Sequence, residues 1–558
     1  MLLIHPPSVY DFRRRRLHYG PIGDLIPSTP IFELYPAGFL SLATYLAGKG
    51  FKVKILNLAA RMLLDSDFNV EEALKRLEAR VYGVDLHWLV HAQGALRVAE
   101  LVKRLHPEGF LLLGGLTSTF FWKTLLENYG FIDAIALGDT TEETVEKLLS
   151  RLSKGKPNLE DVDNLAWRRE GRVKLNRLRP APESLDNYAI DYGYLVREFL
   201  DSWPSPIPFA RFMREPIGLA LTVKGCPHNC ITCGGSSYTY GRYLLRNRLG
   251  FKSPAKIAWE ILSLLEYARI PVFVVGDLQL AGLKRLEELS RLLREAKLDS
   301  PLIYEFFTPP SLEALKLLRK TSERVRLQIS PESHEEAVRA AFGRKYGNRE
   351  LEAFIMQAYS LDFERLDLYF MVGLPGQTYH SALETPKYFR RLLSEKRLSR
   401  FLNAFMAPLA PFIDPGSLVY DRPEAFGYKL HFKSFESHVK ALEASRSWSE
   451  MLNYETRWMG RAEIVRAAYG AARELLQAKI DYGIIGEEEG LETLETLTKA
   501  EKAEVGGLKL RETIPSGDLY PARSLLLSLK PKFYELLATF LLKRGLTLLS
   551  ERIAKLTS

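Results

Sequence analysis

The first 150 residues alternate short apolar runs with stretches of helical periodicity. Five apolar runs predict strands, at residues 2–4, 52–56, 81–84, 110–113 and 134–137. Three amphipathic stretches between or after them predict helices, at residues 39–47, 95–105 and 142–152. This alternation is typical of a parallel sheet and predicts a doubly wound α/β domain over residues 1–150. Such sheets bind ligands at the carboxyl ends of their strands, where Gly114, Gly115 and Gly138 stand.

The alternation stops after residue 150 and resumes near residue 211. Residues 151–210 are rich in Pro, Arg and Asp and contain a predicted hairpin around Glu170-Gly171, so we expect a linker there. Residues 211–430 again alternate strands with helices, which predicts a partial (β/α)6 barrel with its site on the carboxyl face. Residues 431–558 are predicted to form a mainly α-helical C-terminal domain.

An apolar stripe runs along the last predicted helix. Its members recur at i, i+3, i+4, i+7 and i+8, and they are Phe533, Leu536, Leu537, Phe540 and Leu541. Such a stripe most often packs on the core of its own protein. Peripheral membrane contact is the alternative, because basic residues flank the stripe at Lys530, Lys532, Lys543 and Arg544.

The composition is that of a globular protein and limits the partners. Hydrophobic residues make up 46% of the 558 residues and charged residues 26%. The net charge of +9 would suit an acidic partner, but no basic stripe with interleaved aromatic residues is present, which disfavours nucleic-acid binding. No apolar run reaches the ~18 residues of a membrane span, and no basic segment precedes the first apolar residues. We therefore expect a cytoplasmic protein.

All three cysteines of the chain stand in one loop, as Cys226, Cys230 and Cys233. Thiolates at this spacing can converge on one soft metal centre, either an iron–sulfur cluster or zinc. Three thiolates leave one position of a cluster open for a substrate or cosubstrate. A structural zinc site that includes His228 is the alternative, although no second Cys/His pair follows at finger spacing. An odd number of cysteines in one loop does not suit a disulfide framework.

The cysteine loop resembles the Cys-x-x-x-Cys-x-x-Cys signature of radical S-adenosylmethionine (radical SAM) enzymes, and later segments resemble that family's motifs in the same order. The resemblance implies that Cys226, Cys230 and Cys233 hold a 4Fe-4S cluster whose fourth iron binds S-adenosylmethionine (SAM). It also implies a set of SAM-binding residues: Gly276, Asp277, Glu332, Ser333, Arg344, Gly373 and Pro375. Asp277 stands where the family often has the glutamate of Gly-Gly-Glu. Residues 408–417 resemble the end of the sixth strand in the cobalamin-dependent class.

The first 150 residues resemble the Rossmann-like cobalamin-binding domain that precedes many radical SAM enzymes. The implied cobalamin-binding residues are Tyr35, Pro36, Gly38, His87, Gly114, Gly115 and Gly138. The Asp-x-His-x-x-Gly motif of base-off methyltransferases does not follow the first predicted strand. The resemblance therefore assigns no histidine of this chain as an axial ligand of cobalt. In the resembling family the loop after the third strand often lies near the lower face of the corrin, so the resemblance implies that His87, Trp88 or His91 faces the cobalt. The alternative for His87 is an ordinary polar loop residue.

The resemblance implies radical C-methylation at an unactivated carbon of an unidentified small-molecule, lipid or peptide substrate. It implies the cofactors 4Fe-4S cluster, SAM and cobalamin, and an external electron donor such as ferredoxin or flavodoxin. No side chain is assigned as catalytic, because the cofactors carry the reaction. Two alternatives stay open. One is a radical reaction that joins carbons or rearranges a ring without methyl transfer, including on a lipid; the other is a zinc-stabilised nucleic-acid-binding protein.

Overall fold

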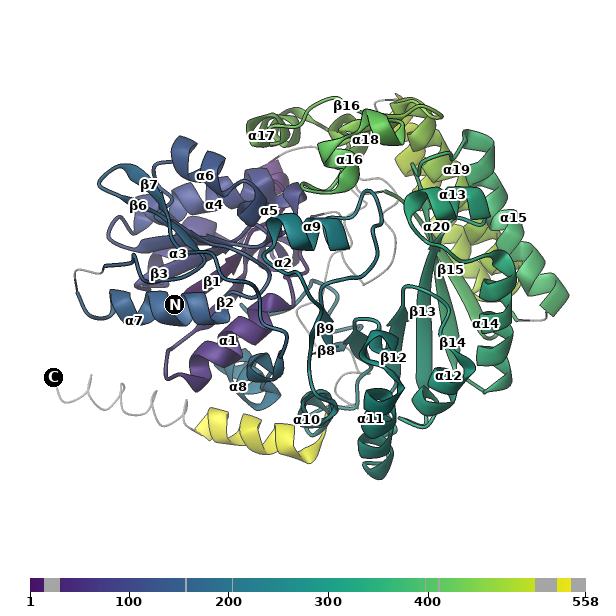
Figure 1. The fold of residues 1–558 in the computed structure, drawn as a ribbon, viewed down its shortest axis with the longest axis horizontal. Coiled ribbons are helices and arrows are strands. Elements are labelled where there is room, and N and C mark those ends of the chain that lie inside the picture. Colours follow the sequence, from purple (N-terminus) through teal and green to yellow (C-terminus); the bar gives the residue numbers. More distant parts are fainter. Residues whose placement is uncertain are drawn as a thin grey trace.

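Two largely parallel sheets lie side by side in the computed structural model (Figure 1). The structure describes residues 1–14, 31–155, 158–202, 204–396, 398–409, 412–506 and 529–542. The first sheet has seven strands in the order β2-β1-β3-β4-β5-β6-β7, and the second has six in the order β15-β14-β13-β12-β11-β8.

The first sheet is doubly wound, as predicted. Its five parallel strands are β1 (Leu2–His5), β2 (Lys54–Asn57), β3 (Val81–Asp85), β4 (Phe110–Gly114) and β5 (Ala134–Ala136). Helices α1 (Gly38–Gly48) and α7 (Glu142–Leu152) cover the face that carries Leu3, Ile55 and Leu112. Helix α4 (Ala92–Leu105) covers the opposite face. Because both faces are covered, the central strands are almost entirely apolar and buried.

The predicted hairpin extends this sheet. It forms β6 (Leu165–Arg169) and β7 (Arg172–Leu175), and β6 pairs antiparallel with β5 from Leu165 opposite Ala136. The same stretch that we expected to be a linker also forms helix α8 (Tyr192–Ser202), which the sequence analysis did not predict. Residues 151–210 therefore contribute regular structure to the first sheet and its surroundings.

The second sheet is the predicted partial barrel. Its strands are all parallel: β8 (Gly218–Leu221), β11 (Val272–Val275), β12 (Leu302–Phe306), β13 (Val325–Glu332), β14 (Arg365–Val372) and β15 (Leu402–Pro408). Helices α10 (Pro254–Leu265), α11 (Leu283–Glu295), α12 (Leu312–Leu318), α14 (Asn348–Ser360) and α15 (Tyr379–Lys396) alternate with these strands along the chain. The predicted fold class is confirmed.

The C-terminal part is mainly helical. Helix α19 (Arg461–Asp481) packs against α15 and β15, and α20 (Glu487–Gly506) packs against α19. A short antiparallel pair, β16 (Tyr428–Leu430) and β17 (Tyr454–Thr456), lies near the end of β14. Among the described residues, no helix is both long and apolar enough to cross a lipid bilayer.

A buried ion pair joins the two halves of the protein, one built on the first sheet and the other on the second. Arg246 and Asp139 pair with side chains that are 1% and 5% exposed, and Arg246 Nη1 donates to the carbonyl oxygen of Pro182 over 2.9 Å. Lys224 Nζ donates to the carbonyl oxygen of Asp139 over 2.8 Å. Asp139 follows β5 and Lys224 follows β8, so the carboxyl ends of the two sheets are fixed relative to each other.

The last described helix, residues 531–542, docks on the protein next to α10 (yellow in Figure 1). Leu529 forms an antiparallel bridge with Ala268, and Lys530 N donates to the carbonyl oxygen of Tyr267 over 2.8 Å. Of the predicted stripe, Phe533, Leu536, Leu537 and Phe540 are half-buried, whereas Leu541 is 57% exposed. The stripe is therefore mostly, but not wholly, packed against the protein. Lys543 and Arg544 lie outside the described residues.

Candidate functional site

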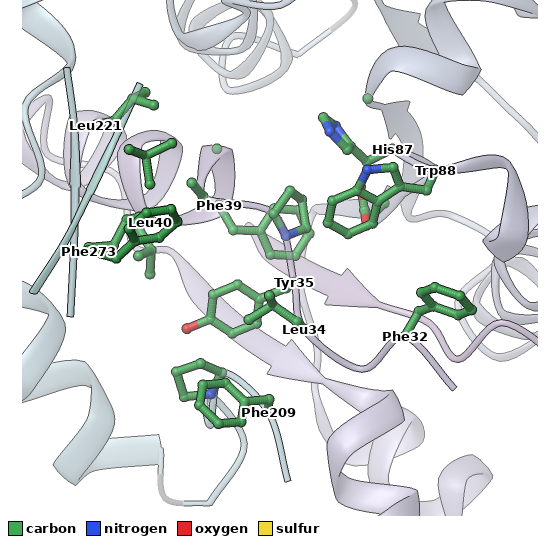
Figure 2. Close-up of a pocket in the computed structure, with 18 of the residues that line it drawn as sticks. Phe32, Leu34, Tyr35, Phe39, Leu40, His87, Trp88, Phe209, Leu221 and Phe273 are labelled. Carbon is green, nitrogen blue, oxygen red and sulfur yellow. The ribbon is translucent and has the colours of Figure 1, made fainter. Parts of the chain in front are cut away.

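A cavity of about 1660 Å³ lies between the two sheets. The segments that follow β3, β4 and β5 line it from one side and those that follow β8 and β11 from the other. Figure 2 shows aromatic side chains of both halves around it, among them Tyr35, Trp88 and Phe273. Because parallel sheets bind ligands at the carboxyl ends of their strands, this cavity is the candidate site.

The cysteine loop follows β8 and is held by an element distant in sequence. Ile231 N donates to the carbonyl oxygen of Phe342 over 2.9 Å. A Cβ atom on the neighbouring Gly343 would meet the Cα atom of Cys230 at 2.9 Å, so only glycine fits there without a shift. This packing fixes the loop with all three predicted ligands lining the cavity: Cys226, Cys230 and Cys233.

Burial raises the pKa of all three thiols, and it raises that of Cys230 to about 11. The positive charge of Arg344 lowers the pKa of Cys226 and Cys230, but by less than burial raises it. Thiolates at this site therefore need a positively charged partner. No three His, Cys, Asp or Glu side chains in the described part of the chain are placed to hold a single metal ion. In an iron–sulfur cluster, by contrast, each thiolate binds a different iron.

Glu332 and Arg344 form a buried ion pair on the cavity wall. Glu332 ends β13 with a φ of 67°, where the pairing with β14 shifts register. Arg344 Nη2 lies 3.2 Å from Glu332 Oε1, while Glu332 Oε2 is buried and bonds to none of the described residues. Burial raises the pKa of Glu332 to about 7, although Arg344 lowers it. A buried carboxylate oxygen without a partner at a cavity wall suits a ligand that donates a hydrogen bond.

Gly276 lines the cavity, but the neighbouring Asp277 does not. Asp277 is fully buried, and its Oδ2 accepts from Gln279 Nε2 over 2.8 Å and from Phe307 N over 3.0 Å. Glu305 of β12 lines the cavity instead and accepts a hydrogen bond from Gly276 N. Burial raises the pKa of Glu305 to about 7.

Three other predicted SAM-binding residues lie outside the cavity lining: Ser333, Gly373 and Pro375. Ser333 Oγ accepts from Glu335 N over 3.1 Å in a local turn. Gly373 has a φ of 101°, and a Cβ atom there would meet the hydroxyl oxygen of Tyr454 at 2.8 Å. The packing of β17 against this turn therefore explains the glycine without any ligand. Of the predicted SAM set, the cavity brings together Gly276, Glu332 and Arg344.

All seven predicted cobalamin-binding residues line the cavity: Tyr35, Pro36, Gly38, His87, Gly114, Gly115 and Gly138. Their glycines differ in what requires them. Gly115 has a φ of 113°, and a Cβ atom there would meet the His87 backbone at 2.6 Å. Neither Gly38 nor Gly114 has a positive φ, and a Cβ atom at either position would meet no heavy atom of the described chain within 4 Å. Nothing in the described fold requires glycine at these two positions, so they leave room for a bound group.

The loop after β3 presents His87 and Trp88 to the cavity, with ring centroids 4.7 Å apart (Figure 2). His87 is held through its backbone, because its carbonyl oxygen accepts from Thr117 Oγ1 over 2.9 Å. His91 is fully buried behind them, with Nε2 3.0 Å from the carbonyl oxygen of Phe32. Burial lowers the pKa of both histidines, that of His91 to about 3. Neutral His87 is the histidine of this loop that faces the cavity.

Two family models match this chain, and together they cover both halves of the cavity. The model described as the B12 binding domain matches residues 26–148, and the model of the radical SAM superfamily matches residues 221–389. The chain combines a B12-binding domain with a radical SAM domain. The second match includes all three cysteines, so the zinc-stabilised nucleic-acid-binding alternative is not retained.

Curated relatives of this B12-binding radical SAM protein are distant. An "Uncharacterized methyltransferase PH0819" of Pyrococcus horikoshii is 25% identical over 54% of this chain and 58% of its own length. An anaerobic magnesium-protoporphyrin IX monomethyl ester cyclase of Rubrivivax gelatinosus is 26% identical over 43% of this chain and 41% of its own. The chain thus spans less than two thirds of the length of these relatives.

Solved structures share the fold. The radical SAM methyltransferase TsrM of Kitasatospora setae, solved with cobalamin and a [4Fe-4S] cluster, has a TM-score of 0.55 and 15% identity. The alignment covers 86% of this chain and 88% of TsrM. The cobalamin-dependent radical enzyme OxsB, solved with aqua-cobalamin and SAM, has a TM-score of 0.53 and 12% identity over 100% of this chain and 80% of its own.

Two acidic residues of the radical SAM half were missed by the sequence analysis. Glu305 lies in a strand whose neighbours Tyr304 and Phe306 are buried, and a carboxylate among buried apolar residues was a usable signal. Asp414 lies in the segment resembling the sixth-strand motif, and its Oδ2 accepts from Gly234 N of the cysteine loop over 2.8 Å. Burial raises the pKa of Asp414 to about 6. No sequence pattern links the segment of Asp414 with the cysteine loop.

Proposed function

We propose that this chain is a cobalamin-dependent radical SAM enzyme that methylates an unactivated carbon of its substrate. The observation that carries the proposal is the cavity that both halves share. The cysteine loop opens into it from one half, and the unexplained glycines of the B12-binding half open into it from the other. The names of the relatives, a methyltransferase in Pyrococcus horikoshii and TsrM in Kitasatospora setae, support methyl transfer.

The residues that would hold the cofactors follow from the cavity lining. Cys226, Cys230 and Cys233 would hold the 4Fe-4S cluster. Glu332 Oε2 and Arg344 would bind the polar groups of SAM, and Glu305 would take the place predicted for Asp277. Gly38, Gly114 and His87 would contact cobalamin together with the rest of the predicted set. When bound, these groups supply one-electron chemistry and a transferable methyl group.

The protein's own residues orient and shield these groups. The Glu332–Arg344 pair keeps one carboxylate oxygen bonded and leaves the other, Oε2, without a partner among the described residues. Glu305, with its pKa near 7, can be protonated or ionised near neutral pH. Apolar side chains such as Phe273, Met371 and Phe405 line the rest of the cavity and would leave little room for water once the cofactors are bound. A reactive radical survives only where water and oxygen are excluded.

The second candidate is a radical reaction that joins carbons or closes a ring without methyl transfer. The cyclase of Rubrivivax gelatinosus, which aligns with 43% of this chain, favours it. Both candidates use the same cavity and the same cofactors, so they differ in products alone.

Two partners belong to the proposal. An electron donor such as ferredoxin or flavodoxin would reduce the cluster. The helix of residues 531–542 would contact a membrane surface, because Leu541 and Leu542 are 57% and 68% exposed, one turn beyond Leu537, which lines the cavity.

Anaerobic reconstitution with iron, sulfide and hydroxocobalamin, followed by reduction and addition of SAM, tests the proposal. We expect about four irons per chain, retained corrin absorbance, and both 5′-deoxyadenosine and S-adenosylhomocysteine. A Cys226→Ala, Cys230→Ala, Cys233→Ala variant should lose the iron and both products but retain the corrin. 5′-Deoxyadenosine that never comes with S-adenosylhomocysteine would favour the second candidate. Stoichiometric zinc with neither product would overturn both.

A further inference from the structure

The cavity continues from the cysteine loop through the barrel to the opposite, amino end of its strands. Along β8 and β11, Leu219, Leu221, Phe273 and Val275 alternate with fully buried residues and line the cavity from inside the barrel. Ile217, which precedes β8, and Ile270, which precedes β11, also line it. Residues that precede parallel strands lie at the amino end of a barrel. The barrel interior is therefore hollow, with the cysteines at one end and a second chamber at the other.

The lining of this amino-end chamber is apolar. It comes from α8, from residues 204–217, from the end of α10 and from the C-terminal segment, with Leu195, Phe199, Phe212, Met213, Phe533 and Leu537 as examples. Among the described residues of these segments, the one charged side chain in the lining is Glu198, whose Oε1 already accepts from Ser202 Oγ over 2.7 Å. The polar lining gathers at the carboxyl end, at the cysteines, Glu305, Glu332 and Arg344. The two ends therefore suit different chemistry.

The proposed cofactors do not account for the apolar end. Cobalamin carries amide side chains and SAM carries charged amino-acid and hydroxyl groups, and these groups need hydrogen-bond partners when buried. The described residues from Leu195 to Phe212 that line this end offer very few hydrogen-bond partners. Long aliphatic chains need no such partners and gain about 0.8 kcal/mol for each methylene removed from water.

The outer wall of the chamber is a fixed part of the fold. Lys532 forms an ion pair with Glu266 and lies 5.0 Å from the centre of the Tyr267 ring. Together with the bridge between Leu529 and Ala268, these contacts set the rotation of the helix 531–542 about its axis. Phe533 and Leu537, one helical turn apart, then face the cavity, while Leu541 in the next turn does not line it.

We propose that the amino-end chamber binds a long aliphatic chain of the substrate, so that the carbon to be modified lies at the cysteine end. The substrate is then a lipid or another molecule with an extended alkyl chain. The inference rests on the proposed function for the reaction, but the chain-binding site itself is tested by binding alone.

The test uses full-length reconstituted enzyme and the fluorescent probe 11-(dansylamino)undecanoic acid. In the wild-type protein the dansyl emission should shift to the blue and saturate at one site per chain. Leu537→Lys places an ammonium group in the chamber wall and should weaken binding at least tenfold. Leu541→Lys is the matched control: the same change one turn along the same helix should leave the dissociation constant within twofold. Circular dichroism, iron and corrin content check that both variants fold.

A chain-length series keeps the inference testable even if Leu537→Lys does not fold. Unlabelled fatty acids of increasing length should displace the probe from the wild-type enzyme, with affinity rising about threefold to fourfold per added methylene until the chamber is full. Equal weakening by both lysine variants, or displacement that is independent of chain length, would overturn the inference. Failure of the proposed function would appear separately, as missing SAM products with chain binding intact.

Discussion

At the scale of single residues, the site depends on two carboxylates in the wall of the cavity. Glu305 and Glu332 both have pKa values raised by burial to about 7, and both line the same cavity. Glu332 is partly compensated by Arg344, whereas Glu305 accepts from the backbone of Gly276. In the absence of a ligand these carboxylates cost stability, which is typical of groups that a protein keeps for binding or chemistry.

Glu305→Gln should therefore change the pH dependence of stability in the cofactor-free protein. The folded protein favours protonated Glu305, so its stabilising effect is present below about pH 4.5 and is lost as the pH rises through 7. The variant should match the wild type at pH 5 and be more stable by about 1–3 kcal/mol at pH 8. Chemical denaturation at both pH values measures this, with Glu313→Gln on the exposed face of α12 as the control. An equal change at both pH values would contradict it.

The two histidines of the loop after β3 should separate binding from folding. His87→Ala removes a side chain that faces the cavity and should lower the corrin retained after gel filtration, with little change in melting temperature. His91→Ala removes a fully buried side chain and should cost about 1–3 kcal/mol of stability. If His87→Ala retained corrin like the wild type, the contact of His87 with cobalamin would be wrong.

At the scale of elements, glycine is found at strand ends for two different reasons. Gly115 is required by its positive φ and by the backbone of His87, whereas Gly114 beside it is required by neither. The fold alone explains the first, and a group bound in the cavity explains the second.

Gly114→Ala and Gly115→Ala form a matched pair that tests this distinction. Gly115→Ala should lower the stability of the protein by about 1–3 kcal/mol, because alanine is strained at a φ of 113° and meets the His87 backbone. Gly114→Ala should keep the melting temperature of the wild type but retain less corrin. Thermal unfolding and corrin absorbance of both variants check the pair. Equal stability losses would show that Gly114 is also structural.

The predictability of the elements follows the strength of their patterns. Five buried strands and the cysteine loop have clear local signals, so both sheets and the position of the cysteine loop could be predicted. Helix α8 has a regular apolar stripe of Tyr192, Leu195, Val196 and Phe199, but the Pro-rich residues around it led us to expect a linker. Residues 204–217 also line the cavity but form no helix or strand, so they have no periodic pattern to predict them. That Glu305 lines the cavity and Asp277 does not could not be predicted, since it depends on which of two neighbouring segments points its carboxylate inward.

At the scale of the whole molecule, the function depends on the fixed relation of two halves. The buried pair of Arg246 and Asp139 and the bond from Lys224 join the strand ends that border the cavity. Removing one partner of a buried ion pair typically costs about 3–5 kcal/mol, so the junction is expensive to loosen. We propose that this junction brings the cluster and cobalamin into one cavity.

Electron paramagnetic resonance of the anaerobically reconstituted enzyme tests that claim most directly. With the cluster reduced and cobalt in the +2 state, two paramagnetic centres in one cavity should broaden or split each other's signals. The cobalt signal should return to its unperturbed form in the variant that lacks all three cysteines, which retains the corrin without a cluster. Cobalt and cluster signals that are identical together and apart would contradict the account.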